Sequence, residues 1–119
     1  MIWLLVALGG AAGATARFGV SQAFAARDGF PWATFGINVA GSLALGLLMG
    51  AFPSPDEAWR LRALLAIGFC GGFTTFSTFS YETVLLLQRG TPLPALGYAF
   101  GSVAAGVLAA WIGLRLGLS

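Results

Sequence analysis

Ten consecutive residues, GGFTTFSTFS from Gly71 to Ser80, combine several kinds of ion-binding group without any charged side chain. Two adjacent glycines precede five hydroxyl residues, and phenylalanine recurs at every third position. In a regular helix, such hydroxyls would bond back to the carbonyls of the preceding turn. Glycine, however, weakens a helix while β-branched threonine stiffens the chain elsewhere. The density of both residue types predicts a local break in a helix.

A helix break at this position would expose backbone groups of both polarities. The carbonyl end of the first half suits a cation, and the N–H end of the second half suits an anion. Phe73, Phe76 and Phe79 are expected to share one face near the break. Such a stripe is ordinarily packing, but an aromatic ring also has a weakly positive edge. With the hydroxyls and the amide of Asn38 as donors, this set suits a small, hard, hydrated anion.

Several donors are needed, because one cannot hold such an ion at membrane depth. Moving a carboxylate-sized ion into a dry interior costs ~20 kcal/mol. One hydrogen bond to a charge returns only about 1.5–3 kcal/mol. We therefore expect a track of weak sites from which the ion can leave. Tyr98 and Ser102, four residues apart on one helix face, are further polar groups at this depth.

The elements that must position these residues are long apolar segments. The chain of 119 residues is 58% hydrophobic and 8% charged, whereas a soluble domain carries about 25% charged residues. About 20 apolar residues suffice for a helix to cross the membrane. We expect an all-α membrane protein with a single four-helix transmembrane domain over residues 1–119, with the third helix broken mid-span and both termini on one side. The four spans are roughly residues 2–24, 31–52, 61–87 and 93–116. The first is interpreted as a retained helix and not a signal peptide, because no Lys or Arg precedes its apolar run.

The composition also excludes several classes of function. Cys70 is the single cysteine, which excludes an internal disulfide and a cysteine-based metal site. No nucleophile–base pair or metal cluster suggests an enzyme. The net charge of +2, without a basic run, does not suggest a nucleic-acid partner.

Glycines recur at four-residue spacing in three of the spans. Such faces let membrane helices approach closely, and we expect them to pack within the bundle, although a face of this kind can also join subunits. The pairs are Gly9 with Gly13, Gly46 with Gly50, and Gly97 with Gly101.

Arginine placement gives no preferred orientation in the membrane. Loops rich in Lys and Arg stay cytoplasmic, but here three arginines fall on each side: Arg17, Arg27 and Arg89 against Arg60, Arg62 and Arg115. The acids are also tied, with Asp28 and Glu82 against Asp56 and Glu57. A chain without bias can insert both ways, and two opposite copies can form an antiparallel dimer. The alternative is that a small excess of charge on one side, set by the membrane context, fixes one orientation.

Several motifs together resemble the Fluc family of fluoride channels, also called CrcB. The strongest match is GFCGGFTTFSTFS, from Gly68 to Ser80, and the others are GINVAGSLALG from Gly36, GGAAGATARF from Gly9 and GYAFGS in the fourth span. The resemblance covers the whole chain. It implies an antiparallel, dual-topology homodimer in the bacterial cytoplasmic (inner) membrane, with two pathways for passive fluoride export that relieves fluoride toxicity.

The resemblance also assigns roles to individual residues. It implies a central structural sodium ion (Na⁺) held by backbone carbonyls of both subunits at Gly71 and Thr74. Where the family often has a further hydroxyl one turn after Ser102, this chain has Gly106, so the lower end of the track would rely on water or other donors. The implied fluoride pathway comprises the ring edges of Phe76 and Phe79, the pore amide of Asn38, the polar track of Thr78, Tyr98 and Ser102, and the charged Arg17 and Glu82 near the pore's ends.

Two other functions compete with this interpretation. A small multidrug exporter of the proton-coupled type is also a four-helix chain, but it needs a carboxylate deep in the first span, and no Asp or Glu precedes Asp28. A non-transporting assembly subunit would explain the glycine faces but leaves the polar break and Asn38 without a role. The lack of histidine and of a deep first-span carboxylate favours a channel over proton-coupled transport.

Overall fold

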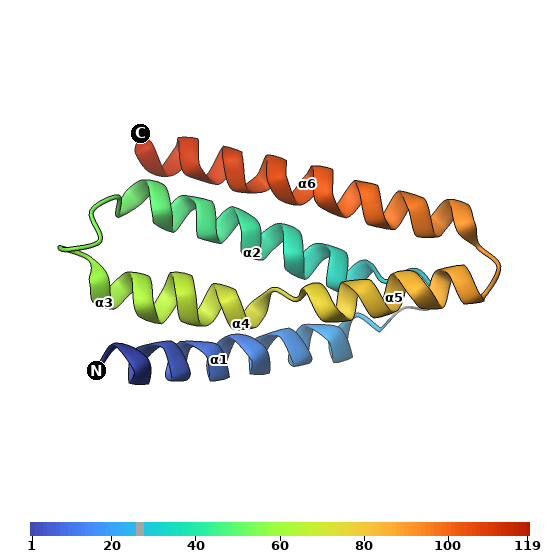
Figure 1. Ribbon diagram of the computed structural model, residues 1–119, viewed down its shortest axis with the longest axis horizontal. Coiled ribbons are helices and arrows are strands. Elements are labelled where there is room, and N and C mark those ends of the chain that lie inside the picture. The colour runs from blue at the N-terminus through green and yellow to red at the C-terminus, as the bar shows by residue number, and fades with distance from the viewer. Residues whose placement is uncertain (26–27) are drawn as a thin grey trace.

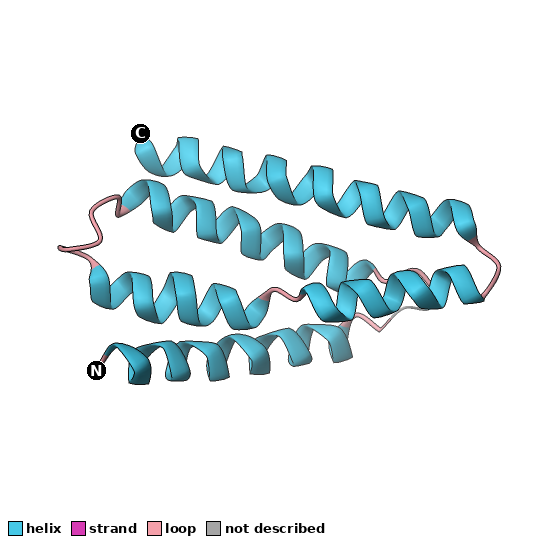
Figure 2. Cartoon of the chain, viewed as in Figure 1, coloured by secondary structure: helices cyan, strands magenta, loops and turns pink. Residues whose placement is uncertain are grey.

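The computed structural model describes residues 1–25 and 28–119, and every regular element in these ranges is helical (Figures 1 and 2). Arg27, one of the arginines counted for orientation, lies outside the described residues. Among the described residues, four helices are long and apolar enough to cross a membrane, as the sequence predicts: Ile2–Ala23, Trp32–Ala51, Trp59–Gln88 and Pro92–Leu118.

The helices form an elongated bundle of 50 × 28 × 20 Å. Both termini lie at the same end, which confirms that expectation (Figure 1). Three of the spans are continuous: α1 (Ile2–Ala23), α2 (Trp32–Ala51) and α6 (Pro92–Leu118). The third span is made of several pieces: α3 (Trp59–Leu61), the π-helical η1 (Arg62–Cys70), α4 (Gly71–Phe73) and α5 (Phe76–Gln88).

The helices α2 and α6 make the most extensive pairing in the bundle, through glycines on both sides. A β-carbon at Gly46 would collide with the backbone of Ala110, and one at Gly113 would collide with the backbone of Leu43. Gly50 and Gly117 repeat this pattern one turn further along. Because only glycine permits such backbone contact, this pair of helices is fixed by van der Waals packing.

Helix α1 packs in the same way on the first half of the third span, defined as Trp59–Phe73. β-Carbons at Gly9 and Gly13 would collide with the carbonyls of Leu64 and Phe69. The first two glycine pairs therefore pack inside the chain, as expected. The third pair differs, because no described atom lies within 4 Å of a β-carbon built at Gly97 or Gly101.

The loop residues at one end of the bundle are ordered by polar contacts. The Asp28 carboxylate accepts hydrogen bonds from the backbone N–H of Phe30 at 3.0 Å and from the indole Nε1 of Trp32 at 3.1 Å. These bonds lower the pKa of Asp28, because they favour its ionised form. At the same end, Gly90 adopts a positive φ of 75° just after α5, a conformation that glycine adopts without strain.

Candidate functional site

The third span is broken at Thr74 and Thr75, which confirms the predicted interruption. Both residues are extended, with φ and ψ of −79° and 155° for Thr74 and −149° and 125° for Thr75. Gly71 and Gly72 remain helical in α4. Gly72 instead permits close packing, since a β-carbon there would collide with the carbonyl of Gly10 in α1.

Asn38 in α2 holds the broken backbone in place. Its Oδ1 accepts from the N–H of Thr75 at 2.8 Å, and its Nδ2 donates to the carbonyl of Thr75 at 3.1 Å. In an unbroken helix, the Thr75 N–H would bond to the carbonyl of Gly71. The break therefore releases the Gly71 carbonyl, and Asn38 satisfies the backbone of Thr75 in its place.

The two helix ends at the break are capped by different groups. The carbonyl end of α4 receives Arg17, whose Nε donates to the carbonyl of Gly72 at 3.1 Å. The N-terminal end of α5 is capped by Thr75, whose Oγ1 accepts from the N–H of Thr78 at 3.2 Å. A cation at a helix C-terminus opposes the negative end of its dipole. The structure thus places Arg17 at the break itself.

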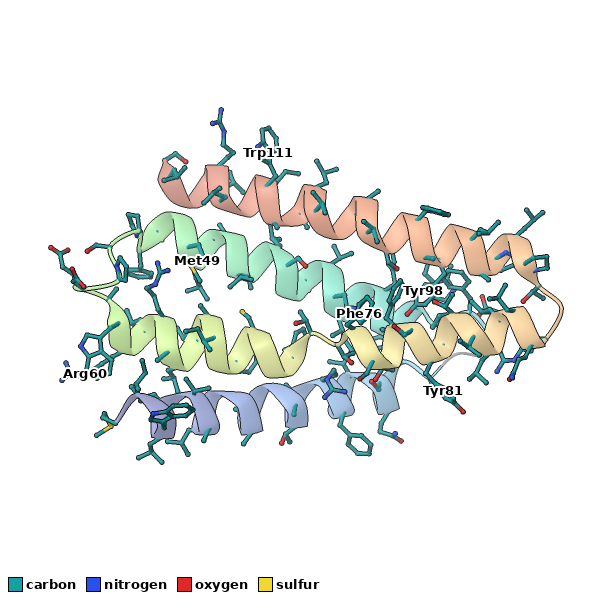
Figure 3. All side chains as sticks on the ribbon, viewed as in Figure 1. Met49, Arg60, Phe76, Tyr81, Tyr98 and Trp111 are labelled. Atoms are coloured by element: carbon teal, nitrogen blue, oxygen red, sulfur yellow. The ribbon has the colours of Figure 1, made fainter. Side chains whose placement is uncertain are left out.

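A central groove of about 460 Å³ runs beside the break, between α2, the third span and α6. Figure 3 shows Tyr98 between α5 and α6, whereas Tyr81 points away from them. Six of the predicted site residues line the central groove: Asn38, Gly71, Thr74, Phe76, Phe79 and Ser102. Its other lining residues include no charged side chain, so its polarity comes from hydroxyls, one amide and the backbone.

Phe79 joins the central groove to a second polar pair. Its ring centroid lies 5.8 Å from that of Phe76 and 5.0 Å from that of Tyr98. Tyr98 is 1% exposed, and its hydroxyl donates to Oε1 of Glu82 at 2.9 Å. The predicted residues are therefore arranged as a series, from Glu82 and Tyr98 past the two phenylalanines to Asn38 and Ser102.

The prediction for Phe73 is wrong, because this ring does not share a face with the other two. It stacks on Phe69 with centroids 5.7 Å apart, whereas Phe76 and Phe79 line the central groove. The extended residues between Phe73 and Phe76 interrupt the helical register, so a spacing of three no longer places residues on one side.

Two groove residues were missed by the sequence reasoning. Thr75 was counted among the hydroxyls, but its part in the pairing with Asn38 carries no sequence signal. Ser42 also lines the central groove. Its signal was present, since it follows Asn38 by four residues and so lies on the same face of α2.

Comparison with known proteins relates the whole chain to one family. Residues 4–114 match the family described as CrcB-like protein, Camphor Resistance (CrcB). The "Fluoride-specific ion channel FluC 2" of Rhodococcus jostii is 53% identical over 116 residues, which cover 98% of each chain. The "Fluoride-specific ion channel FluC" of Novosphingobium aromaticivorans is 49% identical over 115 residues, covering 93% of this chain and 91% of that one. A protein of the same name from Thermus thermophilus is 47% identical over 117 residues, covering 97% of this chain and 92% of that one.

Proposed function

Because the chain belongs to the CrcB-like family, we propose that it is a fluoride-selective channel through which fluoride leaves the cell passively, relieving fluoride toxicity. The chain is a multi-pass membrane protein and not an enzyme. The support for fluoride comes from relatives that are named as fluoride-specific channels and that match this chain along nearly their full length. The multidrug exporter is not favoured, because α1 carries no carboxylate.

The observation that carries the proposal is the chemistry of the central groove. Phe76 and Phe79 lie beside Asn38 and Ser102 with no charged side chain among the lining residues. Ring edges, hydroxyls and an amide offer several weak positive contacts to an anion, and none of them holds it permanently. In this proposal, fluoride moves past Tyr98, Phe79, Phe76, Asn38 and Ser102. Thr78, Arg17 and Glu82 adjust the local potential.

We further propose that two chains of opposite orientation form the functional unit. Non-helical backbone at membrane depth is stable only when it is buried in protein or lines a polar cavity. In the single chain, however, the groove beside Thr74 and Thr75 is open, and Phe76 is 78% exposed. A second copy over this face would cover the break, and the tied arginine count supports an antiparallel arrangement.

The backbone at the break suits the sodium ion that the family implies. The Gly71 and Thr74 carbonyls have lost their helical partners, because the N–H of Thr75 bonds to Asn38 and that of Thr78 bonds to Thr75. Both residues line the central groove, and unwound carbonyls are suitable ligands for Na⁺. Gly71 and Thr74 of two copies would hold the ion, which would tie the two breaks together.

The proposal is tested by fluoride efflux from liposomes. The purified protein is placed in vesicles loaded with potassium fluoride or potassium chloride, and efflux is started with valinomycin and followed with ion-selective electrodes. We expect rapid loss of fluoride and little loss of chloride. Efflux of chloride without fluoride would refute the proposed selectivity.

The dimer is tested at Gly71, where no described atom lies within 4 Å of an added β-carbon. Gly71→Leu should therefore fold as a single chain but fail to form a dimer, because the added side chain occupies the face proposed for the partner. Gel filtration in detergent with light scattering measures the mass of the protein and so distinguishes monomer from dimer. Gly97→Leu asks the same question at a second glycine with open space around it. A dimeric and fully active Gly71→Leu protein would contradict the proposed interface.

A further inference from the structure

Several helical hydroxyls in the described part of this protein bond back to their own helix, and two that line the central groove do not. Thr15, Ser21 and Thr83 each donate to the carbonyl four residues earlier, at 2.7, 2.9 and 2.9 Å. Such bonds are the usual way in which a helix satisfies a hydroxyl in an apolar environment. Ser42 and Ser102 differ, since neither hydroxyl bonds to another described residue, and Oγ of Ser102 is buried without a partner.

These two unpaired hydroxyls belong to facing helices and line the same space. Ser42 lies on α2 and Ser102 on α6, and both line the central groove. A buried polar group without a partner costs about 1–3 kcal/mol. Oγ of Ser102 is such a group, and it lies beside the same cavity as the Ser42 hydroxyl, which indicates that a ligand supplies the missing bond.

Gly106 shows why the Ser42 hydroxyl matters in this particular chain. Gly106 follows Ser102 by one turn of α6, so it lies on the same face of that helix. A β-carbon at Gly106 would have only one described neighbour within 4 Å, Oγ of Ser42 at 3.7 Å. The hydroxyl of α2 thus reaches the position to which a side chain at residue 106 would point.

We propose that Ser42 is a further ion-binding residue and forms, with Ser102, a station for a small, partly hydrated anion beside Gly106. This proposal rests on the proposed function and adds a residue to its pathway. Both hydroxyls donate to the anion and no proton is transferred, so the station works equally well in either direction of flow. Leu45 and Val103 also line the central groove and give it an apolar wall beside these hydroxyls.

The main test moves the hydroxyl from one helix to the other. Ser42→Ala should reduce fluoride efflux about tenfold, which corresponds to about 1.4 kcal/mol. Adding Gly106→Ser to that variant should restore most of the flux, because its side chain points to the same place. Adding Gly106→Ala should not, because a methyl group cannot donate. Ser21→Ala, which removes a hydroxyl that bonds back to Arg17, is the matched control and should transport at the parental rate.

Three results would overturn the proposal while the parental protein still transports fluoride. These are parental flux in Ser42→Ala, failure of a folded Ser42→Ala/Gly106→Ser protein to recover, and equal recovery with Gly106→Ala. Dimer formation of every variant is checked by gel filtration.

A second measurement does not depend on flux or on Ser42→Ala folding. In a Cys70→Ser background, fluoride should slow the reaction of Ser42→Cys with a small methanethiosulfonate, while Ser21→Cys reacts at a rate independent of fluoride. Protection in a protein that does not transport would support the station and refute the channel. Absence of protection in a transporting protein would refute the station alone.

Discussion

The two halves of the third span are anchored to different helices and by different kinds of contact. The first half, Trp59–Phe73, lies backbone to backbone against α1, where Gly9 and Gly13 leave no room for a side chain. The second half, α5, lies against α6 through side chains, with Tyr98 bonded to Glu82 and its ring against Phe79. The first contact has no tolerance for added volume, whereas the second consists of the groups that could contact an ion.

This difference assigns different tasks to the two halves. The break between them is held by Asn38, which pairs with the backbone of Thr75, and by Arg17, which caps Gly72. Changes where the first half meets α1 should therefore affect folding, and changes in the second half should affect permeation. The following predictions run from the largest expected effect to the smallest.

The largest effect is expected where α1 meets the first half. Gly13→Leu should prevent formation of a folded protein, because a β-carbon at Gly13 would already collide with the backbone of Phe69. Such an overlap with backbone cannot be relieved by a rotamer change. Gel filtration in detergent should show aggregated protein. The matched control is Gly19→Leu, also in α1, since no described atom lies within 4 Å of a β-carbon there. A monodisperse Gly13→Leu protein would show that the α1 contact tolerates added volume.

The next largest effect is expected at the break itself, where Asn38 pairs with Thr75. Asn38→Asp keeps the side-chain shape but loses the Nδ2 donor that bonds to the Thr75 carbonyl. It also adds a negative charge beside the anion path. At an effective dielectric of about 20, two like charges about 4 Å apart repel by ~4 kcal/mol, which corresponds to about a thousandfold loss of flux. The loss of flux is measured as fluoride efflux from liposomes.

Asn38→Ala separates the two causes, because it removes the pairing without adding charge. It should retain more flux than Asn38→Asp. If both variants lose the same amount, the repulsion argument fails and the loss reflects a collapsed break.

A smaller but still severe effect is expected in the second half. Phe76→Leu and Phe79→Leu keep most of the apolar volume but remove the positive ring edge. Each should lower fluoride efflux by about 10- to 100-fold, or about 1.4–2.8 kcal/mol. The dimer should still form. Phe73→Leu is the matched control, since Phe73 stacks on Phe69 and does not line the central groove; its flux should stay near the parental rate. A loss of flux in Phe73→Leu as large as in the other two would mean that aromatic packing, and not the ring edge, sustains transport.

Much of the fold follows from local sequence properties. Hydropathy alone places the four spans, because the bilayer demands about 20 apolar residues for each. The glycine spacing predicts the close approach of Gly9 and Gly13 to a neighbouring helix, although it cannot name that neighbour. The π-helical bonding of Arg62–Cys70 was not predicted from the sequence.

The types of residue that form the site could be predicted from the sequence, but the contacts between them could not. The glycines and hydroxyls predict a break, but its position at Thr74 and Thr75 depends on Asn38, which is 37 residues away from Thr75 in sequence. The Arg17 contact with Gly72 is likewise set by how α1 packs on the first half. Such pairings require the three-dimensional arrangement, because nothing near either residue encodes its partner.

The smallest effect is expected at Arg17, which sits on the carbonyl end of the first half. A hydrogen bond from a charged group contributes about 1.5–3 kcal/mol, and the helix dipole adds about 0.3–1 kcal/mol. Arg17→Gln should lower the unfolding temperature by several degrees, because it removes the charge and the Nε donor that reaches Gly72. Arg17→Lys keeps the positive charge and should lose less. Both are measured by thermal unfolding in detergent, with fluoride efflux recorded in parallel. If Arg17 acts only as a cap, the loss of flux should follow the loss of stability across the two variants. A stable Arg17→Lys protein without transport would instead place Arg17 in the ion pathway, and the division between an anchoring half and a permeating half would no longer hold at the break.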